Sequence, residues 1–130
     1  MRFVLASYVA VLALSAIDAI TTMLAVGNDI GYEVNPFVKI LLLNNNFLIL
    51  KIAITGIAFA VATKILDKNL RVLKACYLSV ITFYSLIIIN NLGVITCSFD
   101  LNLDMGKMVA IVAVLFLLYF KAIQDSQRQP

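Results

Sequence analysis

The sequence predicts an all-α fold, an integral membrane four-helix bundle. Of its 130 residues, 63% are hydrophobic and only 13% are charged, and the mean hydropathy is +1.04. A soluble domain of this size is roughly half apolar and about a quarter charged, and its small core could not hide this much hydrocarbon from water. The apolar residues also fall into four runs, each close to the ~20 residues that cross a bilayer core. The lipid bilayer is therefore the first partner that the sequence predicts.

The four runs are expected to form one transmembrane domain, residues 1–123, followed by a polar cytoplasmic tail at 124–130. The connections between the runs are short, so the chain has no room for a second domain. The membrane spans are expected at about 3–26, 47–66, 72–95 and 105–123.

Ahead of the second span, the stretch "NPFVKILLL" predicts a short interfacial helix over 36–43. Asn35 is a favourable helix cap and Pro36 is a favourable first helical residue. The three asparagines at 44–46 are expected to break or kink this helix. One uninterrupted helix from 36 to 66 would be ~46 Å long, which exceeds the bilayer core unless the helix tilts or protrudes.

The positions of the basic residues predict the orientation. One set of helix ends carries most of them: Arg2, Lys64, Lys68, Arg71, Lys74, Lys121 and Arg128. The other side carries Lys39 and Lys107, with acidic residues nearby: Asp29, Glu33, Asp100 and Asp104. Cytoplasmic loops are enriched in lysine and arginine, so both termini are expected in the cytoplasm of a multi-pass protein of the cell membrane. This placement also explains the net charge of +3 without a nucleic-acid partner.

No cofactor or metal is expected from the sequence. The chain has no histidine, the commonest metal ligand and the commonest general acid or base. Its cysteines, Cys76 and Cys97, lack the spacing of a redox or zinc motif.

Asp18 lies inside the first predicted span, ~12 Å below the outer surface at 1.5 Å of rise per residue. Ser15, Asp18 and Thr22 stand at i, i+3 and i+7, which places them on one helix face, and Thr21 lies beside them. An aspartate at such a depth costs up to about 2.5–3.5 kcal/mol on the membrane-insertion scale. This cost predicts either a polar partner or a protonated, uncharged carboxyl.

The second and third spans supply candidate partners in the same outer half of the bilayer. Lys51 lies ~6 Å into the second span, and its long stem can reach further along the apolar wall. Thr55 follows one turn later, and Asn91 lies four residues before the end of the third span. We therefore expect one buried polar cluster: Asp18, Thr21, Thr22, Lys51, Thr55 and Asn91.

Two further features flank this cluster. Gly56 and Ala60 form a small-xxx-small pair, which allows another helix to approach closely. Glu33 precedes Asn35 and Pro36 in the outer loop, where it is expected to pair with Lys39 or to cap the cluster.

Four stretches together resemble an uncharacterised family of small archaeal and bacterial membrane proteins, catalogued as a domain of unknown function. They are "DAITT" at 18–22, "GYEVNP" at 31–36, "LKIAITG" at 50–56 and "NL" at 91–92. The resemblance covers roughly residues 3–95, three of the four spans, and brings no established activity. It implies these signature positions: Asp18, Thr21, Thr22, Glu33, Asn35, Pro36, Lys51 and Asn91.

The leading hypothesis is a non-enzymatic accessory or assembly subunit that binds a larger membrane protein or another copy of itself. Its polar cluster would then be a structural ion pair that sets the register of the helices. The alternative is a small cation- or proton-linked transporter or channel that uses Asp18, because ionisable residues inside a membrane are candidates for function. An intramembrane enzyme with Asp18 and Glu33 as acid and base ranks last, because no nucleophile–base pair is visible.

Overall fold

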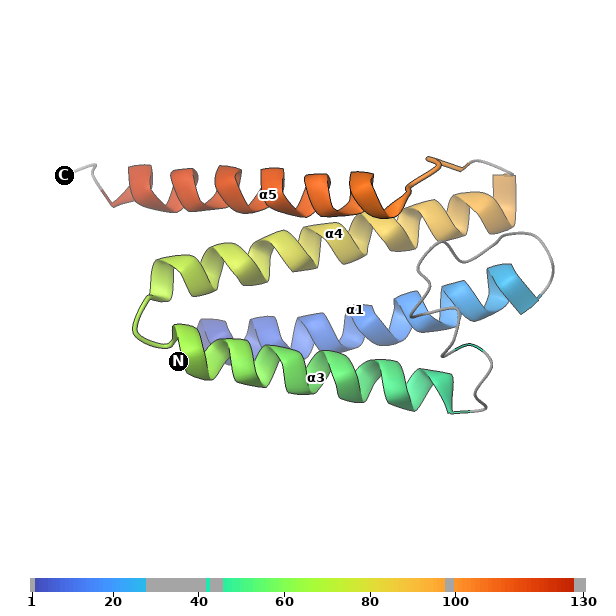
Figure 1. The fold of residues 1–130 in the computed structure, drawn as a ribbon, viewed down its shortest axis with the longest axis horizontal. Coiled ribbons are helices and arrows are strands. Elements are labelled where there is room, and N and C mark those ends of the chain that lie inside the picture. The colour runs from blue at the N-terminus through green and yellow to red at the C-terminus, as the bar shows by residue number, and fades with distance from the viewer. Residues whose placement is uncertain (1, 28–41, 43–45, 98–99, 128–130) are drawn as a thin grey trace.

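The computed structural model describes residues 2–27, 42, 46–97 and 100–127 of the chain. Four long helices run antiparallel to their neighbours in sequence (Figure 1): α1 (Arg2–Gly27), α3 (Phe47–Leu66), α4 (Leu70–Cys97) and α5 (Met105–Ser126). All four are long and apolar enough to cross a membrane. The described part of the chain holds no strand, and the all-α, four-helix prediction is confirmed.

An asparagine or aspartate directly precedes the first residue of α3, α4 and α5. Asn46 occupies a turn directly before α3, which begins at Phe47, and its side chain makes no capping hydrogen bond to the helix. The side chain of Asn69 accepts a hydrogen bond from the Val72 backbone N–H at 3.3 Å, at the start of α4. Asp104 does the same for α5, accepting from the Lys107 backbone N–H at 2.8 Å. Such caps satisfy N–H groups that have no partner within the helix.

Three helices run past the expected limits of their spans, α1 by one residue at each end. α4 begins at Leu70 rather than at 72 and continues to Cys97 rather than 95. α5 continues through Ser126, so the first residues of the expected polar tail are helical. Hydropathy marks the part of a helix that suits lipid, whereas backbone hydrogen bonds continue into the polar flanks until a cap ends them. The short helix expected over 36–43 and three predicted residues lie outside the described part of the chain: Glu33, Asn35 and Pro36.

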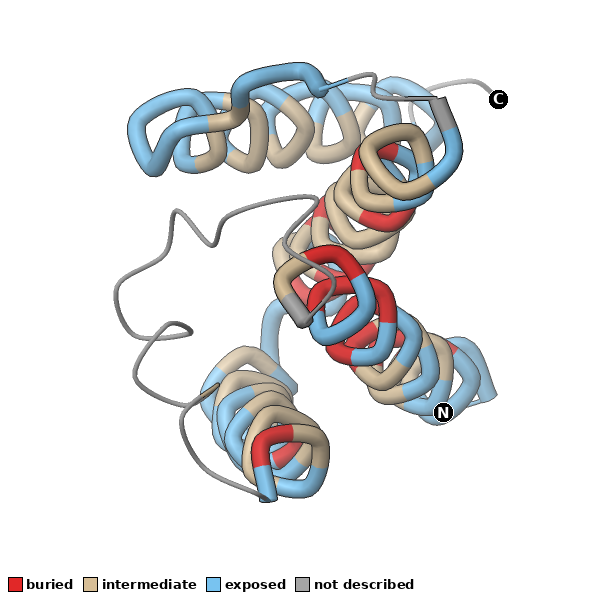
Figure 2. The backbone as a smooth tube through the Cα atoms, turned by 90° about the vertical axis from the view of Figure 1, so that its right-hand side faces the viewer, coloured by how far each residue is buried: buried red, intermediate tan, exposed pale blue. Residues whose placement is uncertain are grey.

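Together with α4, α1 is an inner helix of the bundle. It packs against α4 on one side and α3 on the other, while α5 packs on α4 (Figures 1 and 2). α3 and α4 follow each other in sequence but share only a slight contact. One end of the bundle holds the beginning of α1, the α3–α4 turn and the end of α5 (Figure 1). We call it the basic end because it carries Arg2, Lys64, Lys68, Arg71 and Lys74.

The buried positions of α1 and α4 include many small side chains, beside the larger Leu73 and Tyr77. On α1, a buried stripe recurs every four residues: Ser7, Val11, Ser15 and Ala19. Ala75 and Ser79 are buried on the facing helix α4. Small residues let helix backbones approach closely, which is how helices gain packing energy when lipid removes the hydrophobic drive. Figure 2 shows the buried positions gathered on α1 and α4.

The outer helices are much more exposed than α1 and α4. α5 has no buried residue, and a hydrogen bond of 2.7 Å between the hydroxyls of Thr82 and Tyr119 joins it to α4. α3 buries only Phe47 and Gly56. Both helices expose large apolar side chains, among them Ile57 and Ile65 on α3 and Leu117 on α5.

Candidate functional site

Asp18 lies at the centre of the candidate site, on the buried face of α1. The residue is 5% exposed, and it shares this face with Ser15 and Thr22, which are also buried. The spacing of one helical turn between these residues explains why they point the same way. A carboxylate at such a position must have partners, because an isolated buried charge is very costly.

Lys51 of α3 supplies the charged partner. Its Nζ lies 2.7 Å from Oδ2 of Asp18, and the two side chains are only 12% and 7% exposed. The same ammonium group lies 5.5 Å from the centre of the Phe47 ring, within the range of a cation–π contact. The ion pair joins residues 33 positions apart in sequence and so connects α1 directly to α3.

Asn91 of α4 closes the cluster from the third side. Its Nδ2 lies 3.2 Å from Oδ1 of Asp18, 3.1 Å from the Thr21 hydroxyl and 3.3 Å from the Thr22 hydroxyl. An amide nitrogen carries two hydrogens, so it shares them among three acceptors. One side chain of α4 thereby holds a full turn of α1.

The two threonines contact Asp18 from within its own helix. The Thr21 hydroxyl donates to the Asp18 backbone carbonyl at 3.1 Å, and the Thr22 hydroxyl donates to Oδ1 at 3.4 Å. Each hydroxyl can therefore donate to Asp18 while it accepts from Asn91. Together with Lys51, these contacts engage both carboxylate oxygens of Asp18.

Thr55 belongs to a second layer of polar contacts, one turn along α3 from Lys51. Its hydroxyl lies 3.0 Å from that of Ser15 and 3.5 Å from that of Tyr84, so it bonds these two residues rather than the carboxylate. Ser15 lies on the same face of α1 as Asp18, and Tyr84 is seven residues from Asn91 on one face of α4. This layer again joins α1, α3 and α4.

α3 approaches α1 closely at Gly56. The Tyr8 hydroxyl donates to its carbonyl at 3.0 Å. A Cβ at this position would lie 3.3 Å from both the Tyr8 hydroxyl and a methyl group of Leu12. The other member of the small pair, Ala60, is exposed and lines a pocket.

Asn90 is a buried polar residue that the sequence did not single out. Its Oδ1 accepts from the Leu101 backbone N–H at 2.8 Å, and its Nδ2 lies 3.5 Å from Oδ1 of Asp100. It therefore ties the segment before α5 to the end of α4. The available signal was the pair "NN" at 90–91, in which adjacent residues of a helix face different directions.

The cluster as a whole is closed and internally satisfied. Every buried side-chain nitrogen or oxygen in the described residues has a hydrogen-bond partner. Within the same residues, no three histidine, cysteine, aspartate or glutamate side chains gather to hold a metal ion. A buried ion pair with its remaining hydrogen bonds made is strongly sensitive to the loss of one partner. The arrangement can thus hold three helices in one register.

Comparison with protein families bears on these same helices. Residues 9–97 match the model of a family described as Domain of unknown function (DUF5658). The chain belongs to the DUF5658 family. The matched range contains Asp18, Lys51 and Asn91, while α5 lies beyond it. No curated protein and no solved structure matches the chain.

The DUF5658 region therefore covers most of α1, α3 and α4, the three helices that the polar cluster connects. It runs from the first half of α1 through α3 to the end of α4. The family description assigns no activity, so function has to be argued from the geometry of the cluster.

Proposed function

We propose that this DUF5658 protein is a multi-pass protein of the cell membrane that acts as a non-enzymatic accessory or assembly subunit. Its polar cluster is a structural clamp in the outer half of the bilayer, holding α1, α3 and α4 together. The four long apolar helices support membrane insertion. The clustering of basic residues at the end that carries both termini supports a cytoplasmic basic end.

The observation that carries this proposal is the closed state of the Asp18 carboxylate. Lys51 engages Oδ2 at 2.7 Å, and Asn91 and Thr22 engage Oδ1 at 3.2 and 3.4 Å. A site that binds and releases an ion needs ligand oxygens free to receive it, whereas a side-chain ammonium already occupies this one. The contacts join three helices, which is the role expected of a clamp.

The outer faces of α3 and α5 support a role in assembly. α5 buries none of its side chains, and it lies beyond the residues matched by the family. Large exposed apolar residues on both helices include Ile57, Ile65 and Leu117. In a membrane these faces contact lipid, a second copy of this chain or a larger membrane-protein partner.

Purification from native membranes in a mild detergent tests the accessory role. A stoichiometric partner or a second copy is expected to remain bound after crosslinking and affinity purification. A variant with leucine-to-alanine changes on the exposed face of α5, such as Leu117→Ala with Leu118→Ala, is expected to release it. A matched variant at the exposed face of α4, Leu86→Ala, should keep it. Recovery of a lone monomer from crosslinked membranes would exclude the proposal.

The alternative is a cation- or proton-linked transporter or channel. Its support is the gathering of carboxylate, hydroxyl and amide groups around Asp18, which are ligand types that hard cations use. In this hypothesis Lys51 is an internal competitor for the carboxylate. Proteoliposomes that hold a sodium or proton gradient distinguish the two: the transporter predicts a flux that Asp18→Asn abolishes, and the clamp predicts none.

A further inference from the structure

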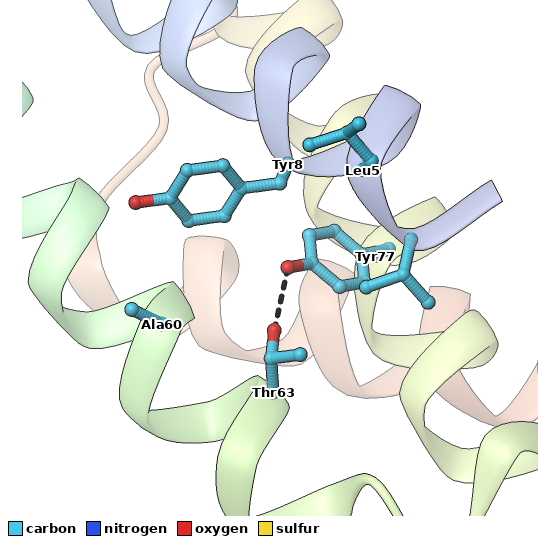
Figure 3. Close-up of a pocket in the computed structure, with 6 residues that line it drawn as sticks. Leu5, Tyr8, Ala60, Thr63 and Tyr77 are labelled. Carbon is cyan, nitrogen blue, oxygen red and sulfur yellow. Dashed lines mark hydrogen bonds between the residues drawn. The ribbon is translucent and has the colours of Figure 1, made fainter. Parts of the chain in front are cut away.

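A pocket lies between α1, α3 and α4 near the basic end, away from the polar cluster. Its volume is about 250 Å³, and Figure 3 shows side chains of all three helices around it. The lining residues are Val4, Leu5, Tyr8, Ala60, Thr63 and Tyr77. Leu5 and Ala60 are exposed, so the pocket opens to the surroundings of the bundle.

The lining of this pocket suits a hydrocarbon guest. Its hydroxyl groups already have partners. The hydroxyl oxygens of Tyr77 and Thr63 lie 2.7 Å apart, and the Tyr8 hydroxyl donates to the Gly56 carbonyl. The remaining surface is aliphatic or aromatic, so a guest needs no hydrogen bonds. An apolar cavity of about 150 Å³ accommodates a benzene molecule, so this pocket of about 250 Å³ has room for a segment of hydrocarbon.

Basic residues gather at the same end of the bundle as this pocket. The basic residues come from all three helices and from the turn that joins two of them: Arg2, Lys64, Lys68, Arg71 and Lys74. Lys74 lies one turn before Tyr77, and its Nζ is 5.5 Å from the centre of the Phe3 ring, next to Val4. Asp67 is the acidic residue of this turn. The ion pairs of the described residues lie elsewhere, at Asp18 and Asp104.

We propose that this pocket binds one acyl chain of an anionic phospholipid whose phosphate is held by the basic residues at its rim. Basic pockets between transmembrane helices on the cytoplasmic side are suited to anionic headgroups. The pocket lies just below the helix ends, where an acyl chain begins if its headgroup is at the surface. Thr63 lies ~5 Å and Tyr77 ~10 Å from the basic ends of their helices. The chain would lie among Tyr8, Ala60 and Tyr77 while the headgroup stays at the surface.

This proposal rests on the membrane insertion proposed above, but not on the clamp or the accessory role. The pocket residues make none of the contacts to Asp18. A failure of lipid binding in a protein that inserts and folds therefore leaves the clamp untouched, and the reverse also holds.

Native mass spectrometry of the full chain in a non-ionic detergent tests the lipid site. Phosphatidylglycerol and phosphatidylcholine with the same acyl chains are titrated separately. One phosphatidylglycerol molecule is expected to bind more tightly than phosphatidylcholine by roughly fivefold or more, which is about the gain from a single basic residue near an anionic headgroup. Equal affinity for the two lipids would overturn the proposal and indicate an unspecific lipid shell.

Two pairs of variants separate the chain from the headgroup. Ala60→Phe fills the pocket and is expected to abolish the binding of phosphatidylglycerol, whereas Ala58→Phe, two residues away and also exposed, should keep it. The double change Lys64→Gln, Lys74→Gln is expected to remove the preference for phosphatidylglycerol, whereas Lys121→Gln on α5 should not. Retention of wild-type binding in either test variant would overturn the proposal. Circular dichroism verifies that each variant keeps its helix content, and the charge variants remain decisive if Ala60→Phe does not fold.

Discussion

Removal of Lys51 is the sharpest test of the clamp. At the observed 2.7 Å, the attraction between the two charges is about 6 kcal/mol for an effective dielectric constant of about 20, before the cost of desolvation. Loss of one partner of a buried pair typically costs about 3–5 kcal/mol. Lys51→Met is expected to reach this range, because the short Asp18 side chain cannot move its charge to water and keeps only the contacts to Asn91 and Thr22.

The reverse change, Asp18→Asn, is expected to cost less. It leaves the ammonium group of Lys51 on a long, flexible stem near the beginning of α3, and such a side chain can extend to the membrane surface. The double variant removes both charges and is expected to recover most of the loss, because replacing a whole buried pair by uncharged groups is often close to neutral. The coupling energy of the double-mutant cycle should therefore be at least ~2 kcal/mol.

The free energy of unfolding can be measured in mixed micelles by raising the fraction of sodium dodecyl sulfate. Far-UV circular dichroism reports the loss of helix in this protein, which has no tryptophan. Lys107→Met is the matched control, because it removes the lysine of an exposed pair with Asp104, and exposed pairs contribute little. The reasoning is refuted if Lys51→Met is no more destabilising than this control, or if the two single changes simply add in the double variant.

Three further predictions concern single contacts. Asn91→Leu removes the amide donor that α4 gives to Asp18, Thr21 and Thr22. It should lower the free energy of unfolding in the same assay by ~1–2 kcal/mol, whereas an unchanged value would show that Lys51 alone holds the carboxylate. Gly56→Leu places side-chain atoms against Tyr8 and Leu12 and should separate α3 from α1. The yield of crosslinks between cysteines placed on the two helices should fall, whereas Ala58→Leu on the exposed side should leave that yield unchanged. The backbone hydrogen bond from Lys107 holds the pKa of Asp104 below its ordinary value, so this cap is present at neutral pH and is lost as the pH falls through the lowered pKa. The amide proton shift of Lys107 should then titrate below about pH 3.9, and a midpoint at or above that value would contradict the cap.

The sequence predicted the number, type and approximate limits of the helices. A run of ~20 apolar residues has few alternatives to a helix in a bilayer, because every backbone polar group must be satisfied within the segment. The ends were less predictable, as α5 shows by continuing to Ser126. Local caps at Asn69 and Asp104 determine where α4 and α5 begin.

Three residues expected in the polar cluster lie together, whereas Thr55 lies in a separate layer of contacts. Similar depth along three spans was enough to expect Asp18, Lys51 and Asn91 near one another, and the structure brings them together. The partners of Thr55 depend on the rotation of α3 about its axis. That rotation cannot be predicted from the sequence of a helix that is apolar on almost every side. The rotation of α4 likewise decides that Asn91 faces α1 while Asn90 faces the segment before α5.

What the sequence determined by itself is therefore a one-dimensional property, the depth at which each side chain lies along its helix. Length and hydropathy set it, because they measure the transfer of each segment between water and lipid. Tertiary structure alone decided which faces meet: that α1 and α4 are the inner helices, that α3 meets α4 through a few side chains such as Thr63 and Tyr77, and that a pocket opens among α1, α3 and α4 at the basic end. In the proposed membrane setting lipid would solvate every apolar face about equally, so these choices would depend on close packing and on a few polar contacts between helices.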